Sequence, residues 1–365
     1  MRALPGPRRF FTRVRDSGPP RLGVERWARP DTCRAVGRAW RAFGNHWDRG
    51  AHPLIDANTL QLAGPVERVR AFWNTEACGT HFVEHAGDDR DFFTRYREFR
   101  YRTEWHIPAF AAFARGGGKR VLEIGCGNGA DGAMFALNGA NYTGVDLTAE
   151  AVDATRRHFA AERLDGVFRQ ENSERLSFAD ESFDIVYSFG VLHHTPVPEQ
   201  AIREVYRVLK PGGTARIMLY HRHSFNYYVR ILGYMRARAL LSVSRRAFRW
   251  RADRRRVAAA ELKGVRGNSS HAVWELHYRN FLKEGWHYFS ARNFVHHCTD
   301  GPECPYAFTY SARDVPRLFA QFRSIDVEVA HFPLNKYPGA WLIPRAVERL
   351  IARNIGWHLL IRATK

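Results

Sequence analysis

Hydrophobic and polar positions divide the chain into stretches of strand period and stretches of helix period. VLEI at 121–124 and YTGVD at 142–146 are short, β-prone apolar runs, as expected of inner strands in a parallel sheet. Nearer the C-terminus the pattern predicts a helix, a strand, a helix and a strand in turn, over 309–322, 325–332, 343–356 and 357–365. Together these segments predict an α/β fold.

Aromatic residues at helical spacing precede the first predicted strand. They are Phe72, Trp73, Phe82, Phe92, Phe93, Phe99 and Trp105. We expect most of them to form the core of a helical cap over 61–118, because aromatic side chains dominate such cores. The polar residues Asn74, Thr80 and His81 stand among them and are candidates to line a pocket. Glycines at 116–118 mark the start of a core over 119–220.

Beyond Tyr220, apolar residues alternate with many arginines, which predicts a basic helical insertion over 221–305. Three interpretations are open: an amphipathic surface for anionic lipid, a phosphate-binding surface, or helices packed on the core with their arginines in solvent. The last is favoured, because runs of charge usually form solvated faces. The apolar runs are too short to span a bilayer. Residues 306–365 then complete the sheet.

A glycine-rich turn follows the strand at 121–124. Gly125, Gly127 and Gly129 stand at alternate positions, which lets backbone amides approach a ligand at the start of a helix. Glu123 argues against a dinucleotide, since a carboxylate there would repel a pyrophosphate but attract a cofactor with a sulfonium and an ammonium group. Asp146 ends the next predicted strand, where a carboxylate accepts ribose hydroxyls.

From these residues onward, the sequence over 119–220 resembles the class I S-adenosylmethionine-dependent methyltransferases. ENSERLSF at 171–178 stands where that family has a Gly-Asp-Ala-Glu-x-Leu-Pro-Phe segment, whose acidic residue and next amide hold the adenine edge; Asn172 replaces the acidic residue. FDIVYSFGVLHHT at 183–195 is similar to the fourth strand and its exit loop. EVYRVLKPGGTARIMLY at 204–220 is similar to the helix, turn and fifth strand that follow. FWNTEACGT at 72–80 is similar to a segment of some bacterial small-molecule members.

The resemblance implies a Rossmann-like sheet of seven strands, mostly parallel with the last strand antiparallel, that binds S-adenosyl-L-methionine at its carboxyl ends. The implied cofactor-binding residues are Glu123, Gly125, Cys126, Gly127, Asn128, Gly129, Asp146, Leu147, Asn172, Ser173 and Phe189. Ser173 would supply a backbone amide, and Cys126 is expected to serve only in packing.

Candidate catalytic residues follow the fourth and fifth strands. His193 and His194 come just after the fourth strand, and Tyr220 and His221 end the fifth, at the same edge of the sheet. A general base is needed only if the methyl acceptor is a hydroxyl or a protonated amine. HHCTDGPECP at 296–305 has neither CxxC nor HxxxH spacing, so we expect no metal there and interpret it as a loop closing on the acceptor pocket.

Charge is concentrated outside the predicted core. The chain carries a net charge of +19, of which residues 1–50 contribute +8 and residues 221–260 contribute +10. Residues 1–60 are rich in Pro, Gly and Arg and predict a partly disordered arm. The five cysteines are scattered and no apolar leader is present, so we expect a cytoplasmic protein, with peripheral membrane association through 221–260 as an open alternative.

Three functions remain at this point. The first is methyl transfer to a small-molecule acceptor, including an apolar or lipid-linked one, enclosed by the cap and the insertion. The second is an RNA methyltransferase whose arm and insertion follow phosphates. Nucleic acid is less favoured, because the fourth strand ends in YSFGVLHH and lacks the Asn/Asp-Pro-Pro-aromatic run of enzymes that methylate base nitrogens. The third is a non-catalytic subunit that binds the cofactor and docks a partner.

Overall fold

The computed structural model describes residues 64–75, 88–246, 270–333 and 342–365. The predicted arm over 1–60 lies outside these ranges, as do Thr80, His81 and Phe82 of the predicted cap. No helix within them is long and apolar enough to cross a membrane.

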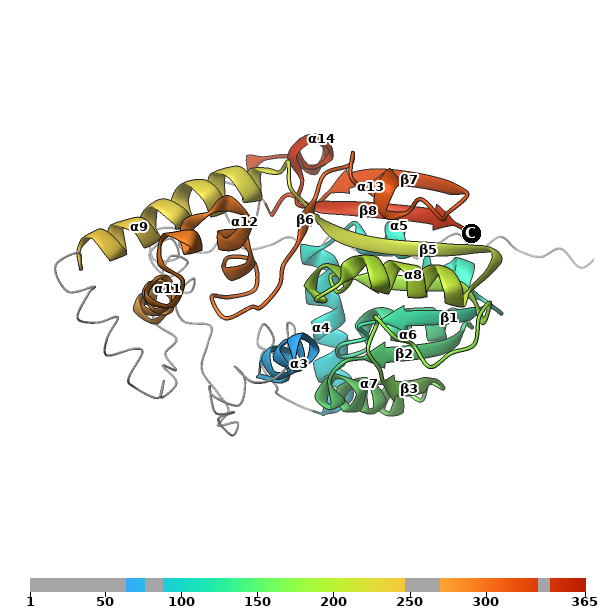
Figure 1. The fold of residues 1–365 in the computed structure, drawn as a ribbon. Coiled ribbons are helices and arrows are strands. Elements are labelled where there is room, and N and C mark those ends of the chain that lie inside the picture. The colour runs from blue at the N-terminus through green and yellow to red at the C-terminus, as the bar shows by residue number, and fades with distance from the viewer. Residues whose placement is uncertain (1–63, 76–87, 247–269, 334–341) are drawn as a thin grey trace, which may run out of the picture.

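One mixed sheet of eight strands forms the centre of the molecule (Figure 1). Its main path runs β3-β2-β1-β4-β5-β8-β7. The first five strands of the path are parallel to one another, and β8 is antiparallel to both of its neighbours. The strands are β1 (Arg120–Ile124), β2 (Asn141–Asp146), β3 (Val167–Gln170), β4 (Phe183–Phe189), β5 (Leu209–His221), β6 (Thr309–Tyr310), β7 (Ser324–Ala330) and β8 (His358–Thr364). The mostly parallel α/β sheet predicted from the sequence is therefore confirmed.

The short strand β6 was not predicted. It pairs in parallel with the end of β5, where Tyr220 faces Thr309. The neighbouring β4 ends at Phe189, opposite Met218, so the last residues of β5 have a free edge that β6 occupies. The helix predicted over 309–322 is therefore wrong at its start, and only Val315–Leu318 form a helix, α13.

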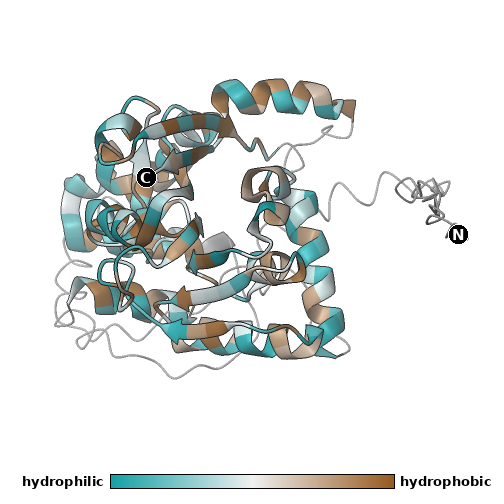
Figure 2. Cartoon of the chain, turned by 90° about the vertical axis from the view of Figure 1, so that its right-hand side faces the viewer, coloured by the Kyte–Doolittle hydropathy of each residue, from teal (hydrophilic) through white to brown (hydrophobic). Residues whose placement is uncertain are grey.

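Alternate residues of the strands face two separate apolar cores, which is why the strands are apolar on both sides. Val121, Tyr187 and Met218 face one core, together with α5 (Ile107–Ala111), the 3-10 helix η2 (Phe113–Gly116), α6 (Ala130–Leu137) and α7 (Ala149–Glu162). Leu122, Val186 and Leu219 face the other, with α8 (Pro198–Val208) and α13. Helix α14 (Arg345–Ile355) packs on β7. In Figure 2 the helices carry both hydrophobic and hydrophilic segments, as helices half-buried on a sheet do.

The cap helices α3 (Pro65–Thr75) and α4 (Asp89–Thr103) lie against the helices that follow β1 and β2. Arg100 of α4 reaches the buried carboxylate of Asp131, at the start of α6, with an Nη2–Oδ2 distance of 2.8 Å. The hydroxyls of Tyr101 and Tyr187 donate to the same carboxylate. Contacts of Arg100, Tyr101 and Tyr187 with Asp131 thus link helix α4, helix α6 and strand β4.

The segment after β5 folds into helices with an apolar core of their own (Figure 1). The helices are the π-helix η4 (Asn226–Met235), α9 (Arg236–Ser244), α11 (Ser270–Glu284), the 3-10 helix η5 (Gly285–Phe289), α12 (Ala291–Phe294) and the 3-10 helix η6 (Val295–His297). This core includes Tyr288, Phe294 and Trp357, and Trp357 immediately precedes β8. The insertion is therefore packed against the edge of the sheet on which the candidate site lies.

Candidate cofactor and acceptor site

The glycine turn between β1 and α6 is held close to the fourth strand's exit loop. Gly125 has φ 80°, and a Cβ built on it would lie 2.1 Å from Cγ2 of Val191. Only glycine fits this position, because both the backbone conformation and the space exclude a side chain. Gly127 has φ 55°, and no atom of the described residues lies within 4 Å of the position of its missing Cβ. Among these residues the turn therefore leaves open space beside Gly127.

Asp146 ties the end of β2 to this turn. Its Oδ2 accepts the amide of Gly127 at 3.1 Å, and its Oδ1 accepts both the amide and the hydroxyl of Thr148 at 3.0 Å. Burial raises the pKa of the carboxyl, while the bonds from Thr148 and Gly127 act in the opposite direction. A carboxylate has about four acceptor positions, so Asp146 keeps capacity for a further hydroxyl donor.

Glu123 is buried at the end of β1, beneath the turn. The Tyr142 hydroxyl donates to its Oε2 at 2.5 Å. Burial raises the pKa of Glu123 well above its ordinary value, and the neighbouring Asp131 adds to the rise, while Tyr142 and Arg100 oppose it. A cationic group placed beside this carboxylate would reverse the rise, because an opposite charge favours the ionised form.

Two further residues of the turn are buried. Asn128 accepts the amide of Ala130 through Oδ1, but its Nδ2 is buried and has no hydrogen-bond partner among the described residues. An unpaired buried donor is costly, so this amide suits an anionic or carbonyl oxygen of a ligand. Burial raises the pKa of the Cys126 thiol, which keeps it protonated and unreactive.

The segments after β2 and β3 form a second wall. Arg70 of α3 and Gln170 both donate to the backbone oxygen of Leu147, so the cap reaches the end of β2. Oδ1 of Asn172 accepts the amide of Glu174 at 3.0 Å, which fixes the turn that also contains the buried Ser173. The Asn172 oxygen is thus already engaged, and one acceptor position is left for an adenine edge.

Phe189, at the end of β4, lies between the cap and the last strands. Arg100 stands over its ring at 5.3 Å, and the rings of His106 and His358 lie 5.8 Å and 5.5 Å from it. We predicted from the sequence that Phe189 binds the cofactor. In the structure its ring lies next to the rings of His106 and His358.

Of the candidate catalytic side chains at this edge of the sheet, His194 has the surroundings that best suit a proton acceptor. Its Nδ1 lies 2.6 Å from the backbone oxygen of Tyr306, so Nδ1 carries the proton and donates to that oxygen. Its Nε2 is buried, has no hydrogen-bond partner among the residues that the structure describes, and lies 3.5 Å from Oδ2 of Asp300. Asp300 also lies 3.3 Å from the hydroxyl of Tyr220. Trp73 of α3 packs edge-on against the His194 ring at 5.1 Å.

The other two candidate histidines differ from His194 in their surroundings. The His193 ring is fully buried and packs 3.9 Å from the Tyr220 ring, and burial holds its pKa well below the ordinary value. His221 follows Tyr220 in β5 and therefore points to the opposite face of the sheet. Its Nδ1 lies 3.0 Å from the backbone oxygen of Gly356. The structure brings His193, His194 and Tyr220 together and places His221 apart from them.

Sequence reasoning missed Asp300 as a partner of His194. It interpreted 296–305 as a loop, and no local pattern marks one aspartate in a loop as the neighbour of a histidine 106 positions earlier. In the described residues two groups could hold a metal ion: His106, His331 and His358, and His194, Asp300 and Cys304. Of the segment HHCTDGPECP, His296 and His297 bond instead to the backbone of Ala307 and Pro302.

Comparison with known proteins identifies the central part of the chain. Residues 122–217 match the family model described as a methyltransferase domain. The ubiquinone biosynthesis O-methyltransferase of Alkalilimnicola ehrlichii is 34% identical over 117 residues, which cover 32% of this chain and 47% of that protein. Its counterpart in Pseudomonas putida is 33% identical over the same length, covering 32% and 50%. The chain thus spans about half the length of these curated relatives.

Among solved structures, an S-adenosylmethionine dependent methyltransferase from Mesorhizobium loti is 17% identical and covers 71% of this chain and 97% of its own. Its TM-score is 0.40, a likeness too weak to add to the assignment.

Proposed function

Because the core of this chain belongs to the class I S-adenosylmethionine-dependent methyltransferases, we propose that it transfers a methyl group to a hydroxyl of a small-molecule acceptor. The observation that carries the choice of a hydroxyl is the environment of His194. Its Nε2 is buried, faces a carboxylate and, within the described part of the chain, has no hydrogen-bond partner. Such a nitrogen is suited to take a proton, which a hydroxyl acceptor must lose.

Buried polar groups around the glycine turn fit the family's cofactor, S-adenosyl-L-methionine. Glu123 would hold its ammonium group, Asn128 Nδ2 its carboxylate, and Asp146 its ribose hydroxyls. Leu147, Asn172 and Ser173 would line the adenine. When bound, the cofactor supplies an activated methyl group with a good leaving group, so the protein mainly aligns the acceptor and excludes water.

The protein's own contribution to the reaction is a proton path at the acceptor. The bond from Nδ1 to the Tyr306 oxygen sets the tautomer of His194 and leaves the lone pair on Nε2. As Nε2 takes the acceptor's proton, the nearby Asp300 carboxylate stabilises the charge that forms on the ring. Tyr220 keeps Asp300 in place through its hydroxyl. Trp73 covers one side of His194 and keeps water from it.

The names of the relatives agree with an oxygen acceptor. Both are named as O-methyltransferases of ubiquinone biosynthesis. The likeness covers about a third of this chain, and the matched methyltransferase model, over residues 122–217, ends before the insertion that supplies Asp300. The acceptor class is therefore proposed from the site, with the relatives in support.

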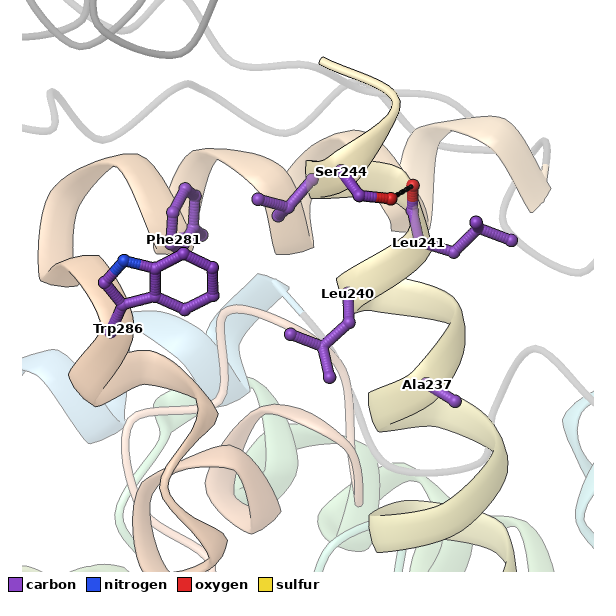
Figure 3. Close-up of a pocket in the computed structure, with 7 residues that line it drawn as sticks. Ala237, Leu240, Leu241, Ser244, Phe281 and Trp286 are labelled. Atoms are coloured by element: carbon purple, nitrogen blue, oxygen red, sulfur yellow. Dashed lines mark hydrogen bonds between the residues drawn. The ribbon is translucent and has the colours of Figure 1, made fainter. Parts of the chain in front are cut away.

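A surface for anionic lipid is proposed alongside this activity. Tyr228, Val229 and Tyr234 of η4 and Leu241 of α9 are about half exposed. Figure 3 shows the Leu241 side chain directed away from Phe281 and Trp286. Leu350 of α14 is 63% exposed, between the exposed arginines Arg349 and Arg353. Helices α9 and α14 lie along the same upper edge in Figure 1. Exposed apolar groups interleaved with arginines suit an interfacial surface, which would give access to a lipid-linked acceptor.

The test is an assay with methyl-labelled S-adenosylmethionine, offered to a panel of phenols and catechols with and without an isoprenoid tail. We expect label in an ether of at least one acceptor and release of S-adenosylhomocysteine. Label in digests of RNA, with none in the panel, would favour the RNA alternative. Tight cofactor binding, with no label in the panel, in RNA or in extracts of cells that lack the gene, would favour a non-catalytic subunit.

A further inference from the structure

Three histidines from distant parts of the chain meet beside the acceptor end of the sheet. His106 stands just before α5, His331 follows β7 and His358 begins β8. The antiparallel pairing of β7 and β8 places Ala330 opposite His358, and the amide of Trp357 donates to the His331 oxygen at 2.8 Å. All three side chains are buried, with exposed fractions of 4%, 8% and 3%.

The ring nitrogens are close enough to share one ion. Nε2 of His106 lies 3.0 Å from Nδ1 of His358, and one nitrogen from each of the three residues lies within 4.8 Å of the others. Nitrogen ligands about 2 Å from a tetrahedral Zn²⁺ are separated by roughly 3.3 Å. Small side-chain rotations would therefore turn the His106 and His358 nitrogens from each other toward a common ion.

Backbone conformation at His331 also indicates a constrained position. Its φ is 65°, in the left-handed region that residues other than glycine rarely adopt. Such strain persists where the surroundings impose it, and it gathers at functional sites. Here it turns the chain directly after β7 and brings the His331 ring to 4.5 Å from the His358 ring.

The surroundings keep these rings neutral. Burial lowers the pKa of both His106 and His358 well below the ordinary value, and the neighbouring histidines add to the effect. A neutral imidazole binds a metal through its unprotonated nitrogen, so the proton shared between His106 Nε2 and His358 Nδ1 would move to another ring nitrogen when the ion binds. Oε1 of Glu104 lies 4.0 Å from Nε2 of His358, on the far side of that ring from Nδ1. A carboxylate behind a ligating histidine commonly orients it.

We propose that His106, His331 and His358 form a binding site for a divalent transition metal such as Zn²⁺. Three imidazole ligands leave a coordination position for water or for an acceptor oxygen. The site lies beside Phe189, at the edge of the sheet that carries His193 and His194. Binding of the ion does not depend on the methyl-transfer proposal.

The second group, His194, Asp300 and Cys304, is a poorer metal site. Its histidine directs Nδ1 toward a backbone oxygen and toward Cys304, while Nε2 faces Asp300. Nδ1 is already engaged by the Tyr306 oxygen at 2.6 Å, so an ion on that nitrogen would have to break this bond. Burial raises the pKa of the Cys304 thiol, and Asp300 adds to the rise, so the thiolate that a metal needs is disfavoured.

The experiment uses Co²⁺ as a spectroscopic probe of the full-length protein stripped of metal, without cofactor or acceptor. We expect one Co²⁺ per chain with visible ligand-field bands, displaced by Zn²⁺. His106→Gln, His331→Gln and His358→Gln should each weaken Co²⁺ binding by more than the roughly 10-fold to 100-fold loss typical of residues that only support a ligand. His277→Gln replaces an equally buried histidine of the insertion and should leave binding unchanged.

A thiolate-to-cobalt charge-transfer band that disappears in Cys304→Ser would overturn the proposal, because the metal would then occupy the second group. Absence of stoichiometric Co²⁺ and Zn²⁺ binding by the wild-type protein would overturn it as well. Because wild-type binding is measured directly, poor folding of a single variant cannot decide the result. Failure of the methyl-transfer assay would leave these measurements unaffected.

Discussion

Nε2 of His194 and Oδ2 of Asp300 lie 3.5 Å apart, although one residue follows β4 and the other follows the helical insertion. This pair predicts how the reaction responds to substitution. His194→Gln should slow methyl transfer to a hydroxyl acceptor by about 10²-fold to 10⁴-fold, the usual contribution of a general base. Asp300→Asn should cause a smaller loss. The dissociation constant for S-adenosylmethionine should stay the same in both variants.

The control for this prediction is an acceptor that is already ionised at the assay pH, such as a nitrophenol. It needs no base, so both variants should approach wild-type rates with it. His223→Gln, at an exposed histidine two residues after β5, should be silent with every acceptor. An equal loss with ionised and neutral acceptors would show that His194 acts only in packing.

Glu123 predicts a pH dependence of cofactor binding. Burial and Asp131 raise its pKa, so as pH falls the carboxyl becomes neutral at a higher pH than an ordinary glutamate. A neutral carboxyl cannot pair with the cofactor's ammonium group. The affinity for S-adenosylmethionine should therefore decrease as pH falls through this raised pKa, and binding near it should release a proton. Calorimetry in buffers of different ionisation enthalpy measures both effects, and Glu123→Gln should remove the proton release.

Asp146→Ala should weaken cofactor binding by about 1.5 to 3 kcal/mol, the scale of one or two hydrogen bonds to a charged group. Part of the loss would come from the turn, because Asp146 also accepts the amide of Gly127. Asp146→Asn keeps one acceptor oxygen and should lose less. Equilibrium dialysis with S-adenosylhomocysteine gives the constants. A wild-type value for Asp146→Ala would mean that the ribose is held elsewhere.

Gly125→Ala should lower the free energy of unfolding of the protein as well as its activity. A methyl group there would lie 2.1 Å from a Val191 methyl, on a backbone with φ 80°. The backbone term alone is about 1 to 3 kcal/mol. Gly127→Ala, with no atom of the described residues within 4 Å of its Cβ, should show only that term. Thermal unfolding compares them, and adding Val191→Ala to Gly125→Ala should recover only part of the steric loss, because the Cβ of residue 191 would still lie 2.9 Å away.

Arginines of the insertion predict binding to anionic vesicles. Replacing Arg245, Arg254, Arg255 and Arg256 by Gln should weaken sedimentation with phosphatidylserine vesicles and reduce its salt dependence, with cofactor binding intact. Arg246 is excluded, because it pairs with Glu275 and lies over the Tyr278 ring inside the insertion. Leu350→Ser should weaken binding independently of salt. If the wild-type protein does not sediment with the vesicles, the arginines form only a solvated face.

The parts of the site that sequence could predict are those set by local backbone chemistry. Gly125 is required by a turn that follows a buried strand, and Asp146 ends the next strand, so their proximity follows from parallel pairing alone. The two C-terminal strands were also predictable, since the apolar residues of IDVEVAHF and WHLLIRATK favour strands.

Contacts between distant segments were not predictable in this way. Residues 309–322 have apolar residues at helical spacing. Thr309 and Tyr310 nevertheless pair with the free edge of β5 and form a strand. His106, His331 and His358 meet only because a cap residue reaches the end of an antiparallel pair. Each of them, taken alone in the sequence, has no pattern that marks it.

Residues 306–308, which lead from the insertion back to the sheet, hold in place the loop that carries His193 and His194. The amide of Phe308 donates to the backbone oxygen of His193, and the Tyr306 oxygen accepts the proton of His194. The match at 122–217 therefore leaves out residues that hold both histidines in place. We expect a chimera in which everything after β5 is replaced to keep both histidines and lose the contacts that orient them, so in this chain the insertion and the core should be exchanged as one unit.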